Sequence, residues 1–503
     1  MRKQRSTKLQ NHFSVALSII VTALCGFFSN AVSADFWVAS PFTDNAVLQR
    51  DLPVPVWGKA EPKSQVTVEF AGQKKSCVAD ADGRWQVKLD PLTGSYVARE
   101  LTVVASGTDD RISIRNVVVG DVWICSGQSN MQMETPKIPA VKALIPSMKH
   151  LRQFTVKQTV AFKEQERCLG KWKTRHPESA VAFAFAYFLQ QHADVPVGIV
   201  QSCWGSSSIE GWMPRDMTDT FPHFKKHMDE FDADEEKHAR IESILNGPKP
   251  WGRKNDIFLR TQPNVIYNAM MHPLAPMACR GIVWYQGEAN AKRIPSMLQY
   301  GKTLPAWVKR YRQAWGRDDL HVLAVMLPGF AKGLKNRVAR PDQKSWAWMR
   351  ESQLKVLDLP HTSVANTIDL GHPTNIHPTD KLPIGKRLAL LAARDTLRQK
   401  NDALGPVLKR VESKSDRLVV HFDHASGLKT RDAKAPTGFW ISGDAEKWVE
   451  ASAEINGESV ILKSAELASP RFVRYAFAGK PKVNLVNNAD LPAYPFRTDN
   501  FKP

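Results

Sequence analysis

Residues 117–129 read Val-Val-Val-Gly-Asp-Val-Trp-Ile-Cys-Ser-Gly-Gln-Ser, an apolar run that ends in a short polar turn. Such a run is typical of a strand that is buried on both faces, as in a parallel sheet. Further apolar runs lie at 195–200 and 281–285, and a helical pattern at 181–191 precedes the first of them. Strands that alternate with helices and end in polar loops predict a parallel α/β domain, whose site lies at the carboxyl ends of the strands.

The segments on either side of this domain have a β pattern. Residues 66–70 and 85–89 alternate between apolar and polar side chains, with turn residues between them, which favours a small β-sandwich. Alternating patterns return in the last hundred residues. The chain thus divides into three predicted domains: an N-terminal β-sandwich at 35–117, an α/β catalytic domain at 118–404 and a β-rich domain at 405–503.

A strongly charged insertion interrupts the α/β pattern at about residues 222–262. Its central part, from Phe224 to Leu245, has a helical composition. We interpret the insertion as a solvated lid or surface arm rather than as a site, because charge runs usually mark a solvated helix face.

The first 34 residues have the pattern of a secretory signal peptide. A basic start precedes the apolar stretch 13–28, and small residues at 31–34 suit cleavage after Ala34. An uncleaved anchor is the alternative, although the stretch is short for a membrane span. No later segment of the sequence is long and apolar enough to cross a bilayer. We therefore expect export to the periplasm or the extracellular space, without stable membrane insertion of the mature chain.

The formal net charge is +19, which is compatible with nucleic-acid binding. The basic residues are spread along the chain, however, and no helix-turn-helix, zinc-finger or RNA-binding signature accompanies them. The sequence therefore predicts no nucleic-acid partner. Attraction to an anionic glycan or surface suits an exported protein better.

The cysteines lack the CxxC spacing of a zinc or redox site. Cys125 and Cys203 lie in or beside apolar runs and are predicted to be buried thiols. One disulfide that involves Cys77, Cys168 or Cys279 is a further possibility, because an exported protein folds in an oxidising compartment.

Ser129 follows the buried run at a point where a strand gives way to a helix. Such a turn exposes the hydroxyl beside free backbone N–H groups, which suits a nucleophile and an oxyanion. The same pattern is typical of a simple helix N-cap, and the G-x-S-x-G elbow of other hydrolases is absent. The residues alone leave both interpretations open.

Two other polar turns end apolar strands. Gly205 lies in the segment 204–208, where the missing Cβ lets a substrate oxygen approach its N–H, although a flexible loop is the alternative. Gln286, Glu288 and Asn290 crowd the second turn, where burial is costly without partners or a ligand. Gln286 and Asn290 are candidates to donate to an oxyanion or to hold a sugar. Glu288 is interpreted as a carboxylate that orients them.

A fourth polar segment, 369–378, reads Asp-Leu-Gly-His-Pro-Thr-Asn-Ile-His-Pro and precedes a helical run. His377 is a candidate general base, because the neutral imidazole accepts a proton near pH 7. A metal site of Asp369, His372 and His377 is the alternative. Such a site requires further ligands, and no HExxH or DxD cluster supplies them, so we predict no metal.

These segments together make the chain resemble the sialate O-acetylesterase family of the SGNH hydrolases. The likeness covers nearly the whole mature chain, and its most specific parts are Cys-Ser-Gly-Gln-Ser-Asn-Met at 125–131 and Trp-Tyr-Gln-Gly-Glu-Ala-Asn at 284–290. Further matching stretches lie at 42–50, 53–58, 484–488 and 495–499.

The resemblance implies a flavodoxin-like, three-layer α/β/α hydrolase domain with β-rich partner regions and no cofactor. It implies that Ser129 attacks an acetyl ester while His377 takes its proton, and that water then hydrolyses the acetyl-enzyme. The implied oxyanion hole consists of the N–H groups of Ser129 and Gly205, with an amide from the 286–290 turn. Gln128 belongs to the same implied substrate-binding set.

The chain departs from the family pattern at two places. Asn375 stands where an Asp-Ile-His sequence is expected, and His372 stands where an Asp is often found. The identity of the acid that orients the base is therefore undecided. The candidates are Asp369, Asp380 and Glu288, and the alternative is a Ser-His dyad without an acid. Ser206 replaces the second glycine of a Gly-Gly pair, which would narrow the pocket.

The sequence thus favours a carbohydrate acetylesterase whose partner is acetylated sialic acid or acetylated plant polysaccharide. One alternative is a non-catalytic glycan-binding protein that kept the fold after losing its acid. Another is a lipase or a peptidase that uses the same residues. A lipase requires an apolar acyl pocket, whereas Gln286, Glu288 and Asn290 suit sugar hydroxyls.

Overall fold

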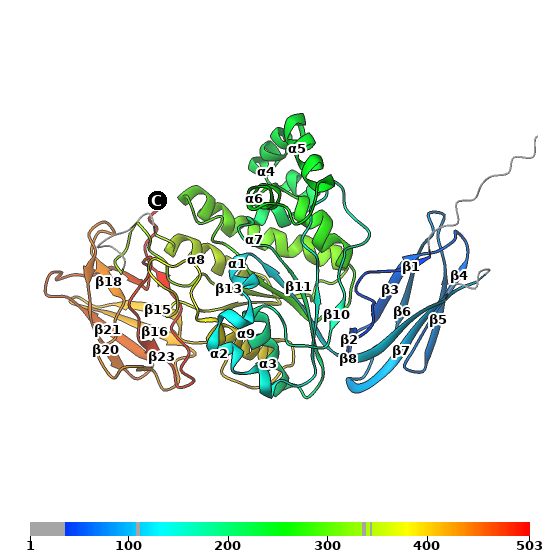
Figure 1. The fold of residues 1–503 in the computed structure, drawn as a ribbon. Helices are drawn as coiled ribbons and strands as arrows, with labels where there is room; N and C mark the ends of the chain where they lie inside the picture. Colours follow the sequence, from blue (N-terminus) through cyan, green and yellow to red (C-terminus); the bar gives the residue numbers. More distant parts are fainter. Residues whose placement is uncertain (1–35, 107–110, 334–338, 343–344) are drawn as a thin grey trace, which may run out of the picture.

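The computed structural model of the chain describes residues 36–106, 111–333, 339–342 and 345–503. The predicted signal segment, residues 1–34, lies outside the described residues. A central mixed sheet covered by helices lies between β structure from the N-terminal part and β structure from the C-terminal part of the chain (Figure 1). The predicted α/β class and the β-rich C-terminal region are confirmed.

The central sheet has the strand order β10-β9-β11-β8-β12-β13-β14. Its strands are β8 (Arg111–Gly127), β9 (Leu151–Thr155), β10 (Trp172–Lys173), β11 (Val197–Cys203), β12 (Gly281–Tyr285), β13 (His321–Val325) and β14 (Thr362–Ala365). All neighbouring pairs are parallel except β10 with β9. Because β8 comes first in the chain but lies in the middle, the connections leave it on both sides. Such a switch point is where open α/β sheets bind ligands.

Strand β8 joins the N-terminal region to the central sheet. Its first part pairs with β7 (Ser95–Ala105) in antiparallel fashion, and its second part pairs with β11 and β12 in parallel. Residues 117–127 of this strand are all buried, as the apolar run predicts. The boundary predicted between residues 117 and 118 therefore falls inside one continuous strand.

The remaining N-terminal strands form β structure beside this strand. They are β1 (Trp37–Val38), β2 (Val47–Gln49), β3 (Val54–Lys59), β4 (Gln65–Phe70), β5 (Gln73–Val78) and β6 (Arg84–Leu89). Strands β1, β3 and β6 make a separate three-stranded sheet. Burial alternates along β4 and β6 because every second side chain faces the apolar core, so the two predicted strands are confirmed.

Helices cover both faces of the central sheet (Figure 1). On one face α3 (Ala180–His192) packs against α9 (Lys381–Asp395), and on the other α7 (Ile294–Trp315) packs against α8 (Ala347–Leu354). The Ser179 hydroxyl accepts a hydrogen bond from Ala182 N–H and caps α3. Eight of the 13 residues of α3 are buried, and these include all of 180–186, so the first two turns are apolar on every side.

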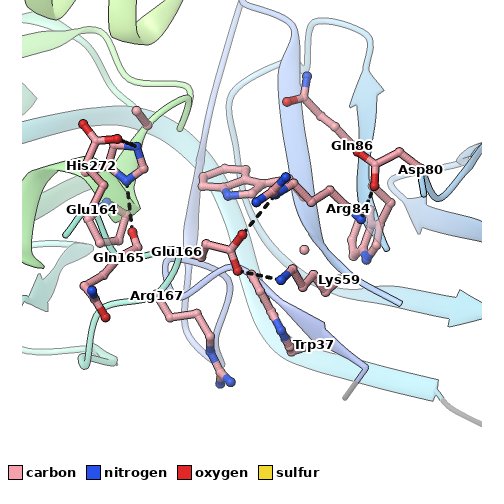
Figure 2. A pocket seen from close by; sticks show the side chains of 15 residues that line it. Trp37, Lys59, Asp80, Arg84, Gln86, Glu164, Gln165, Glu166, Arg167 and His272 are labelled. Atoms are coloured by element: carbon pink, nitrogen blue, oxygen red, sulfur yellow. Dashed lines mark hydrogen bonds and ion pairs between the residues drawn. The ribbon is translucent and has the colours of Figure 1, made fainter. Parts of the chain in front are cut away.

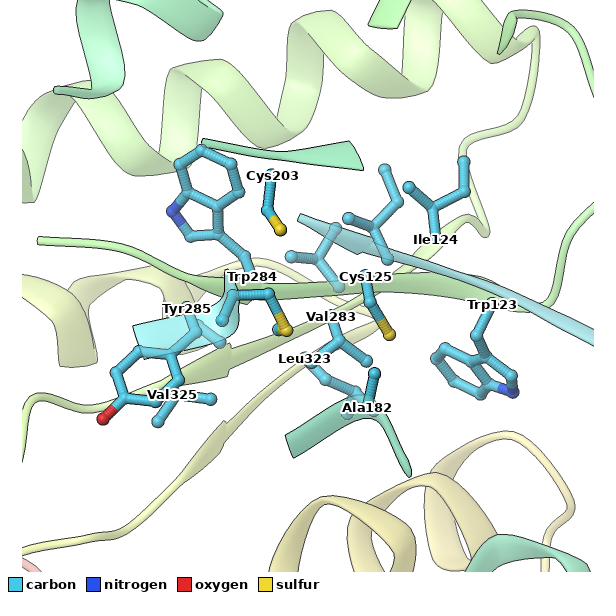
Figure 3. Packing of buried hydrophobic residues seen from close by; sticks show 14 of the residues in the cluster. Trp123, Ile124, Cys125, Ala182, Cys203, Val283, Trp284, Tyr285, Leu323 and Val325 are labelled. Carbon is cyan, nitrogen blue, oxygen red and sulfur yellow. The ribbon is translucent and has the colours of Figure 1, made fainter. Parts of the chain in front are cut away.

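The core of the sheet combines large aromatic side chains with thiols (Figure 3). Trp123 and Trp284 are 0% and 1% exposed and fill the two sides of the sheet. Cys125 and Cys203 are 0% and 4% exposed, which confirms their prediction as buried thiols. All five cysteines of the described residues are free, so the disulfide that the sequence left open is not formed there.

The charged insertion is helical, as predicted, and projects from the face that carries α7 (Figure 1). It consists of α4 (Pro222–Asp232), α5 (Glu235–Asn246) and α6 (Arg253–Arg260). The first two helices bury an apolar face against the protein: Phe224, Met228, Phe231, Ile241 and Ile244. The insertion is therefore packed in place, and only its outer face is solvated.

The C-terminal region contains three small sheets whose strand pairs are antiparallel. Their orders are β15-β16-β21-β20, β17-β23 and β19-β18-β22-β24. The strands are β15 (Val407–Ser413), β16 (Leu418–Asp423), β17 (Lys429–Thr430), β18 (Phe439–Ser442), β19 (Val449–Glu450), β20 (Ser452–Asn456), β21 (Ser459–Lys463), β22 (Phe472–Tyr475), β23 (Leu485–Val486) and β24 (Phe496–Arg497). Across the ranges that the structure describes, no helix has the length and apolar character to span a membrane.

Candidate active site

Ser129 begins the short helix α1 (Ser129–Gln132) at the carboxyl end of β8. The turn before it depends on Gly127, whose φ is +133°. A Cβ at this position would lie 2.1 Å from the backbone oxygen of Tyr285, so only glycine lets β8 and β12 end side by side. The turn therefore presents the Ser129 hydroxyl at the switch point of the sheet.

His377 lies against this hydroxyl. Its Nε2 is 2.8 Å from Ser129 Oγ, although 248 residues separate the two in the chain. Burial and the positive charge of Lys381 lower the pKa of His377. The imidazole is thus neutral at neutral pH, and its Nε2 accepts a hydrogen bond from the serine hydroxyl. This is the geometry of a nucleophile and its general base.

The loop that carries His377 is held by its own side chains. Asn375 Oδ1 accepts from His377 N–H at 2.9 Å, and Asn375 Nδ2 donates to His377 O at 3.0 Å. His372 Nδ1 accepts from the backbone N–H groups of Thr374 and Asn375. The two departures from the family pattern, Asn375 and His372, therefore bind backbone of the loop. Within the described ranges, no side chain hydrogen-bonds to Nδ1 of His377.

Asp369 is held elsewhere, which corrects its assignment as the orienting acid. Arg387 donates to both of its carboxylate oxygens at 2.7 Å, and Arg431 donates to one of them at 3.1 Å. Burial alone would raise the pKa of Asp369, but these arginines outweigh it and hold the pKa below its usual value. Asp380, the second candidate, accepts from Gly371 N–H at 2.9 Å. Neither carboxylate contacts His377.

Glu288, the third candidate, belongs to a buried bridge beside the dyad. Its Oε1 accepts from Asn130 Nδ2 at 2.5 Å, and Asn130 Oδ1 accepts from Lys381 Nζ at 2.6 Å. Asn130 Nδ2 also donates to the backbone oxygen of Ile376 at 3.0 Å. The three side chains of this bridge are at most 4% exposed. Asn130, which directly follows Ser129, thus binds the backbone of the residue before His377.

Burial shifts both charged ends of the Glu288–Asn130–Lys381 bridge toward their neutral forms. It raises the pKa of Glu288 and lowers the pKa of Lys381 to about 8. The second carboxylate oxygen of Glu288 has no hydrogen-bond partner among the described residues. Glu288 therefore orients Asn130, rather than Gln286 and Asn290 as the sequence suggested.

Two backbone N–H groups lie beside the nucleophile. That of Ser129, in the first turn of α1, has no acceptor within the described residues. That of Gly205 donates to Gln132 Oε1 at 2.7 Å. A Cβ at Gly205 would lie 3.3 Å from Ser129 Cβ, so the two predicted oxyanion donors are neighbours. In this structure the Gln132 side chain occupies the Gly205 N–H.

The predicted amide donors of the 286–290 turn are satisfied within the protein. Gln286 is fully buried, and its Nε2 donates to Asn290 Oδ1 at 2.9 Å and to Gln128 Oε1 at 3.2 Å. Asn290 Nδ2 donates to both carboxylate oxygens of Glu210 at 3.0 Å. These side chains connect the ends of β8, β11 and β12 and form the rigid base of the site. They are not free to hold a sugar.

Arg260 is a site residue that the sequence did not indicate. It ends α6 of the insertion, and its Nη1 would lie 3.5 Å from a Cβ at Gly205. Asp256 neutralises part of its charge at 3.4 Å. The insertion therefore brings a guanidinium close to the nucleophile. Ser206 directly follows Gly205 in the sequence. It has an exposed side chain and a φ of +63°, a conformation that favours glycine.

No group of three or more His, Cys, Asp or Glu side chains that could hold a metal occurs within the ranges that the structure describes. The site itself presents a serine hydroxyl, an imidazole and backbone amide groups, which are suited to nucleophilic attack, proton transfer and binding of an oxyanion.

Comparison with known proteins places these features in a family context. Residues 251–393 match a family model described as "Carbohydrate esterase, sialic acid-specific acetylesterase". The sialate O-acetylesterase of Mus musculus is 26% identical over 518 residues, which cover 92% of this chain and 93% of that protein. The sialate O-acetylesterase of Rattus norvegicus is 28% identical over 509 residues, with 90% and 91% covered.

A solved structure is also similar over nearly the whole chain. The crystal structure of a carbohydrate acetylesterase from Xanthomonas citri has a TM-score of 0.78 and 34% sequence identity. The match covers 92% of this chain and 100% of that one.

Proposed function

This chain belongs to the sialate O-acetylesterase family of carbohydrate esterases, and we propose that it removes O-acetyl groups from carbohydrate through an acetyl-enzyme on Ser129. One observation carries the mechanism: the 2.8 Å contact between Ser129 Oγ and His377 Nε2 at the carboxyl end of β8. It supplies a nucleophile and a base in one hydrogen bond, as acyl transfer requires.

The reaction proceeds in two halves. His377 Nε2 takes the proton from Ser129 Oγ as that oxygen attacks the acetyl carbonyl carbon, and a tetrahedral oxyanion forms. The N–H groups of Ser129 and Gly205 stabilise this oxyanion once Gln132 has moved. His377 then gives its proton to the departing sugar oxygen, which leaves an acetyl ester on Ser129. In the second half His377 takes a proton from a water molecule that attacks this ester, and it returns that proton to Ser129 Oγ as the ester bond breaks and acetate leaves.

We propose that the base works as a dyad with the nucleophile. Nδ1 of His377 has no carboxylate partner among the described residues, and Asp369 is bound by Arg387 and Arg431. The orientation of the imidazole comes from its loop, through Asn375 and through the bridge that Asn130 makes to Ile376. A carboxylate would also stabilise the imidazolium, so the dyad is expected to be slower than a complete triad.

Three further points belong to this proposal. The catalytic domain is an SGNH hydrolase, which the parallel strands and the placement of Ser129, Gly205 and His377 support. The substrate is an acetylated sialic acid or an acetylated plant polysaccharide. The protein is exported, for which the signal-like sequence of residues 1–34 is the support.

The function is tested by acetate release from acetylated xylan, acetylated xyloglucan and O-acetylated sialic acid. Wild type should release acetate from at least one of them, and Ser129→Ala should release none. The control is Ser452→Ala, which changes an exposed serine of β20 in the C-terminal region. If the wild type released no acetate from any of the three carbohydrates or from a small aryl acetate, the glycan-binding alternative would be favoured instead.

The low pKa of His377 predicts activity that persists into acidic solution. The neutral imidazole is the active form, so kcat/KM falls only as the pH drops through the pKa of His377, below its ordinary value of about 6.5. Lys381→Met removes a positive charge that lowers this pKa and should therefore move the acidic limb to higher pH. The matched control is Lys386→Met, an exposed lysine of the same helix. A limb at the same pH in wild type and Lys381→Met would contradict the prediction.

Asp369→Asn should cost stability but little catalysis. The substitution leaves Arg387, whose side chain is 10% exposed, without its charged partner, and lowers the free energy of unfolding by about 3 kcal/mol. Hydrolysis of an aryl acetate per folded molecule should stay within about threefold of wild type. Loss of a genuine triad acid would instead cost about 10⁴-fold in kcat. Asp490→Asn, at an exposed partner of Arg431, serves as the control and should change stability by less than about 0.5 kcal/mol.

A further inference from the structure

A cavity of about 970 Å³ lies between the β1-β3-β6 sheet and two segments of the α/β region (Figure 2). The sheet supplies one wall, and residues 164–167 and 272–275 supply the other. Neither Ser129 nor His377 lines it. Its volume is at the upper end of the range of about 300–1,000 Å³ that ligand sites occupy. We call it the indole cleft, because Trp37, Trp57 and Trp85 line it.

The wall formed by the sheet is unusual for a surface that faces away from a core. In the strand register Trp37 pairs with Lys59 and Lys59 with Arg84, whereas Trp57 pairs with Gln86. Paired residues lie on the same face of a sheet, and residues two apart share that face. Two indole rings therefore lie among long polar side chains on one flat surface, where an outer β face normally carries polar residues alone.

The aromatic rings of the cleft are fixed in position before any ligand arrives. The guanidinium of Arg167 lies 5.2 Å from the ring centroid of Trp37, and Phe42 packs edge-on against Trp57 at 5.3 Å. Both tryptophans are half-buried, so part of each ring stays accessible. Rigid side chains lose little conformational entropy on binding, which favours their use as contact surfaces.

Ion pairs organise the polar groups of the cleft. Glu166 accepts from Arg84 Nε at 3.0 Å and pairs with Lys59 Nζ at 3.0 Å, so it connects the two walls (Figure 2). Within the second wall, His272 Nε2 lies 3.2 Å from a carboxylate oxygen of Glu164. These side chains keep unused donor and acceptor capacity toward the cleft, because each guanidinium and carboxylate can make several hydrogen bonds.

The charges of the cleft nearly cancel. Three side chains that line it are cationic and three are acidic: Lys59, Arg84, Arg167, Asp80, Glu164 and Glu166. This balance argues against a ligand selected by its own charge, such as a polyanion. Planar apolar rings beside hydrogen-bonding groups instead suit a molecule whose faces carry C–H groups and whose rim carries hydroxyls. A sugar ring has this character.

We propose that the indole cleft binds a neutral segment of a polysaccharide chain, with sugar rings stacked on Trp37 and Trp57. This is a second glycan site, separate from the one that holds the acetyl ester. The two are linked through the protein, since His272 follows Met271, whose sulfur accepts a hydrogen bond from Ser126 Oγ of β8. A polymer held in the cleft stays near the enzyme between turnovers, which raises the local concentration of its acetyl groups.

The test is affinity electrophoresis in gels that contain deacetylated xylan or deacetylated xyloglucan. All proteins carry Ser129→Ala, so binding is measured without turnover and independently of the esterase mechanism. The parent should be retarded by at least one of these glycans. Trp37→Ala and Trp57→Ala should each weaken the retardation about tenfold, as loss of an aromatic anchor does. Trp57→Phe keeps a ring and should stay within about threefold of the parent.

Controls separate binding from folding and from catalysis. Trp448→Ala, at a half-buried tryptophan of the C-terminal region, should bind as the parent does. Thermal unfolding identifies any variant that fails to fold, and the other of the two alanine variants then carries the comparison. With Ser129 intact, Trp37→Ala should hydrolyse an aryl acetate at the wild-type rate but have a raised KM for the acetylated polymer.

Three results would overturn the proposal. The first is a parent that neither neutral glycan retards, and the second is a pair of alanine variants that both bind as the parent does. The third is a parent that is retarded only in a gel that contains polygalacturonate, an anionic polysaccharide. The last result would assign the cleft to an anionic ligand. None of these depends on whether Ser129 is the nucleophile, so failure of the cleft and failure of the esterase mechanism are distinguishable.

Discussion

Replacing His377 by alanine should lower kcat for acetate release by about 10⁴-fold, the upper end of what a general base contributes. His377 Nε2 is the ring nitrogen that contacts Ser129 Oγ, at 2.8 Å. Without it the hydroxyl keeps its proton, and neither the attack nor the departure of the sugar oxygen has a proton carrier. The ring is half-buried at the end of a loop, so its loss should not unfold the protein.

The measurement is kcat for an aryl acetate and for the best carbohydrate substrate, with thermal unfolding as the check on folding. His227→Ala, at an exposed histidine of α4, is the matched control and should behave as wild type. If His377→Ala kept more than about a tenth of the wild-type kcat, another group would be the base, and the dyad would be rejected.

Replacing Asn130 by alanine should remove about 3 kcal/mol from the free energy of unfolding and lower kcat as well. The substitution leaves Lys381 Nζ without its acceptor and Glu288 without its donor, both in a site that is almost inaccessible to water. A buried charge that loses its partner costs about 3–5 kcal/mol. It also frees the backbone oxygen of Ile376, so the loop of His377 loses its tie to the helix of Ser129.

Denaturant unfolding measures the stability, and kcat at saturating aryl acetate measures the catalytic effect, expected to be about 10- to 100-fold because a displaced base weakens proton transfer. Asn456→Ala, at an exposed asparagine of β20, should change stability by less than about 0.5 kcal/mol. A loss below about 1 kcal/mol in Asn130→Ala would show that the bridge does not stabilise the fold.

Much of the fold, and the position of Ser129 at the end of a buried strand, could be predicted from local patterns. The apolar run at 117–129 predicts a strand buried on both faces, and residues 117–127 are buried throughout. Because the carboxyl ends of neighbouring parallel strands meet at one edge, the turns at Ser129, Gly205 and Gln286 could be expected to converge. They do so, on β8, β11 and β12.

The partners of the polar residues could not be predicted in this way. Gln286 and Asn290 have the composition of ligand-binding amides, yet each is satisfied by neighbouring protein groups. A residue type states how many hydrogen bonds a side chain can make, and only the three-dimensional arrangement determines which groups receive them. Asp369 is one of three candidate acids in the sequence, but Arg387 and Arg431 from other segments bind its carboxylate.

Lys381 and Arg260 were missed for a related reason. Each lies on a helix whose local pattern is ordinary, and each reaches the site only because tertiary packing brings that helix near Ser129. A weak signal existed for Lys381, since a lysine in the first turn of a helix is unfavourable to the helix dipole. Its buried bond to Asn130 provides the compensation.

The absence of a carboxylate at His377 within the described residues gives the site a specific character. Asn375 and His372 bind backbone of their own loop. The Glu288–Asn130–Lys381 bridge also holds that loop, because Asn130 donates to the backbone oxygen of Ile376. In the proposed dyad, these contacts take over the orienting role of an acid, and the electrostatic contribution of an acid is missing. We expect an active esterase with a modest kcat.

The most direct test is to trap the acetyl-enzyme. Wild type is mixed with an aryl acetate, quenched in acid during the first turnovers, digested and analysed by mass spectrometry. The account predicts the mass of one acetyl group on the peptide that contains Ser129, and none in Ser129→Ala. An acetyl group on another residue, or turnover by wild type without any acetylated peptide, would contradict it.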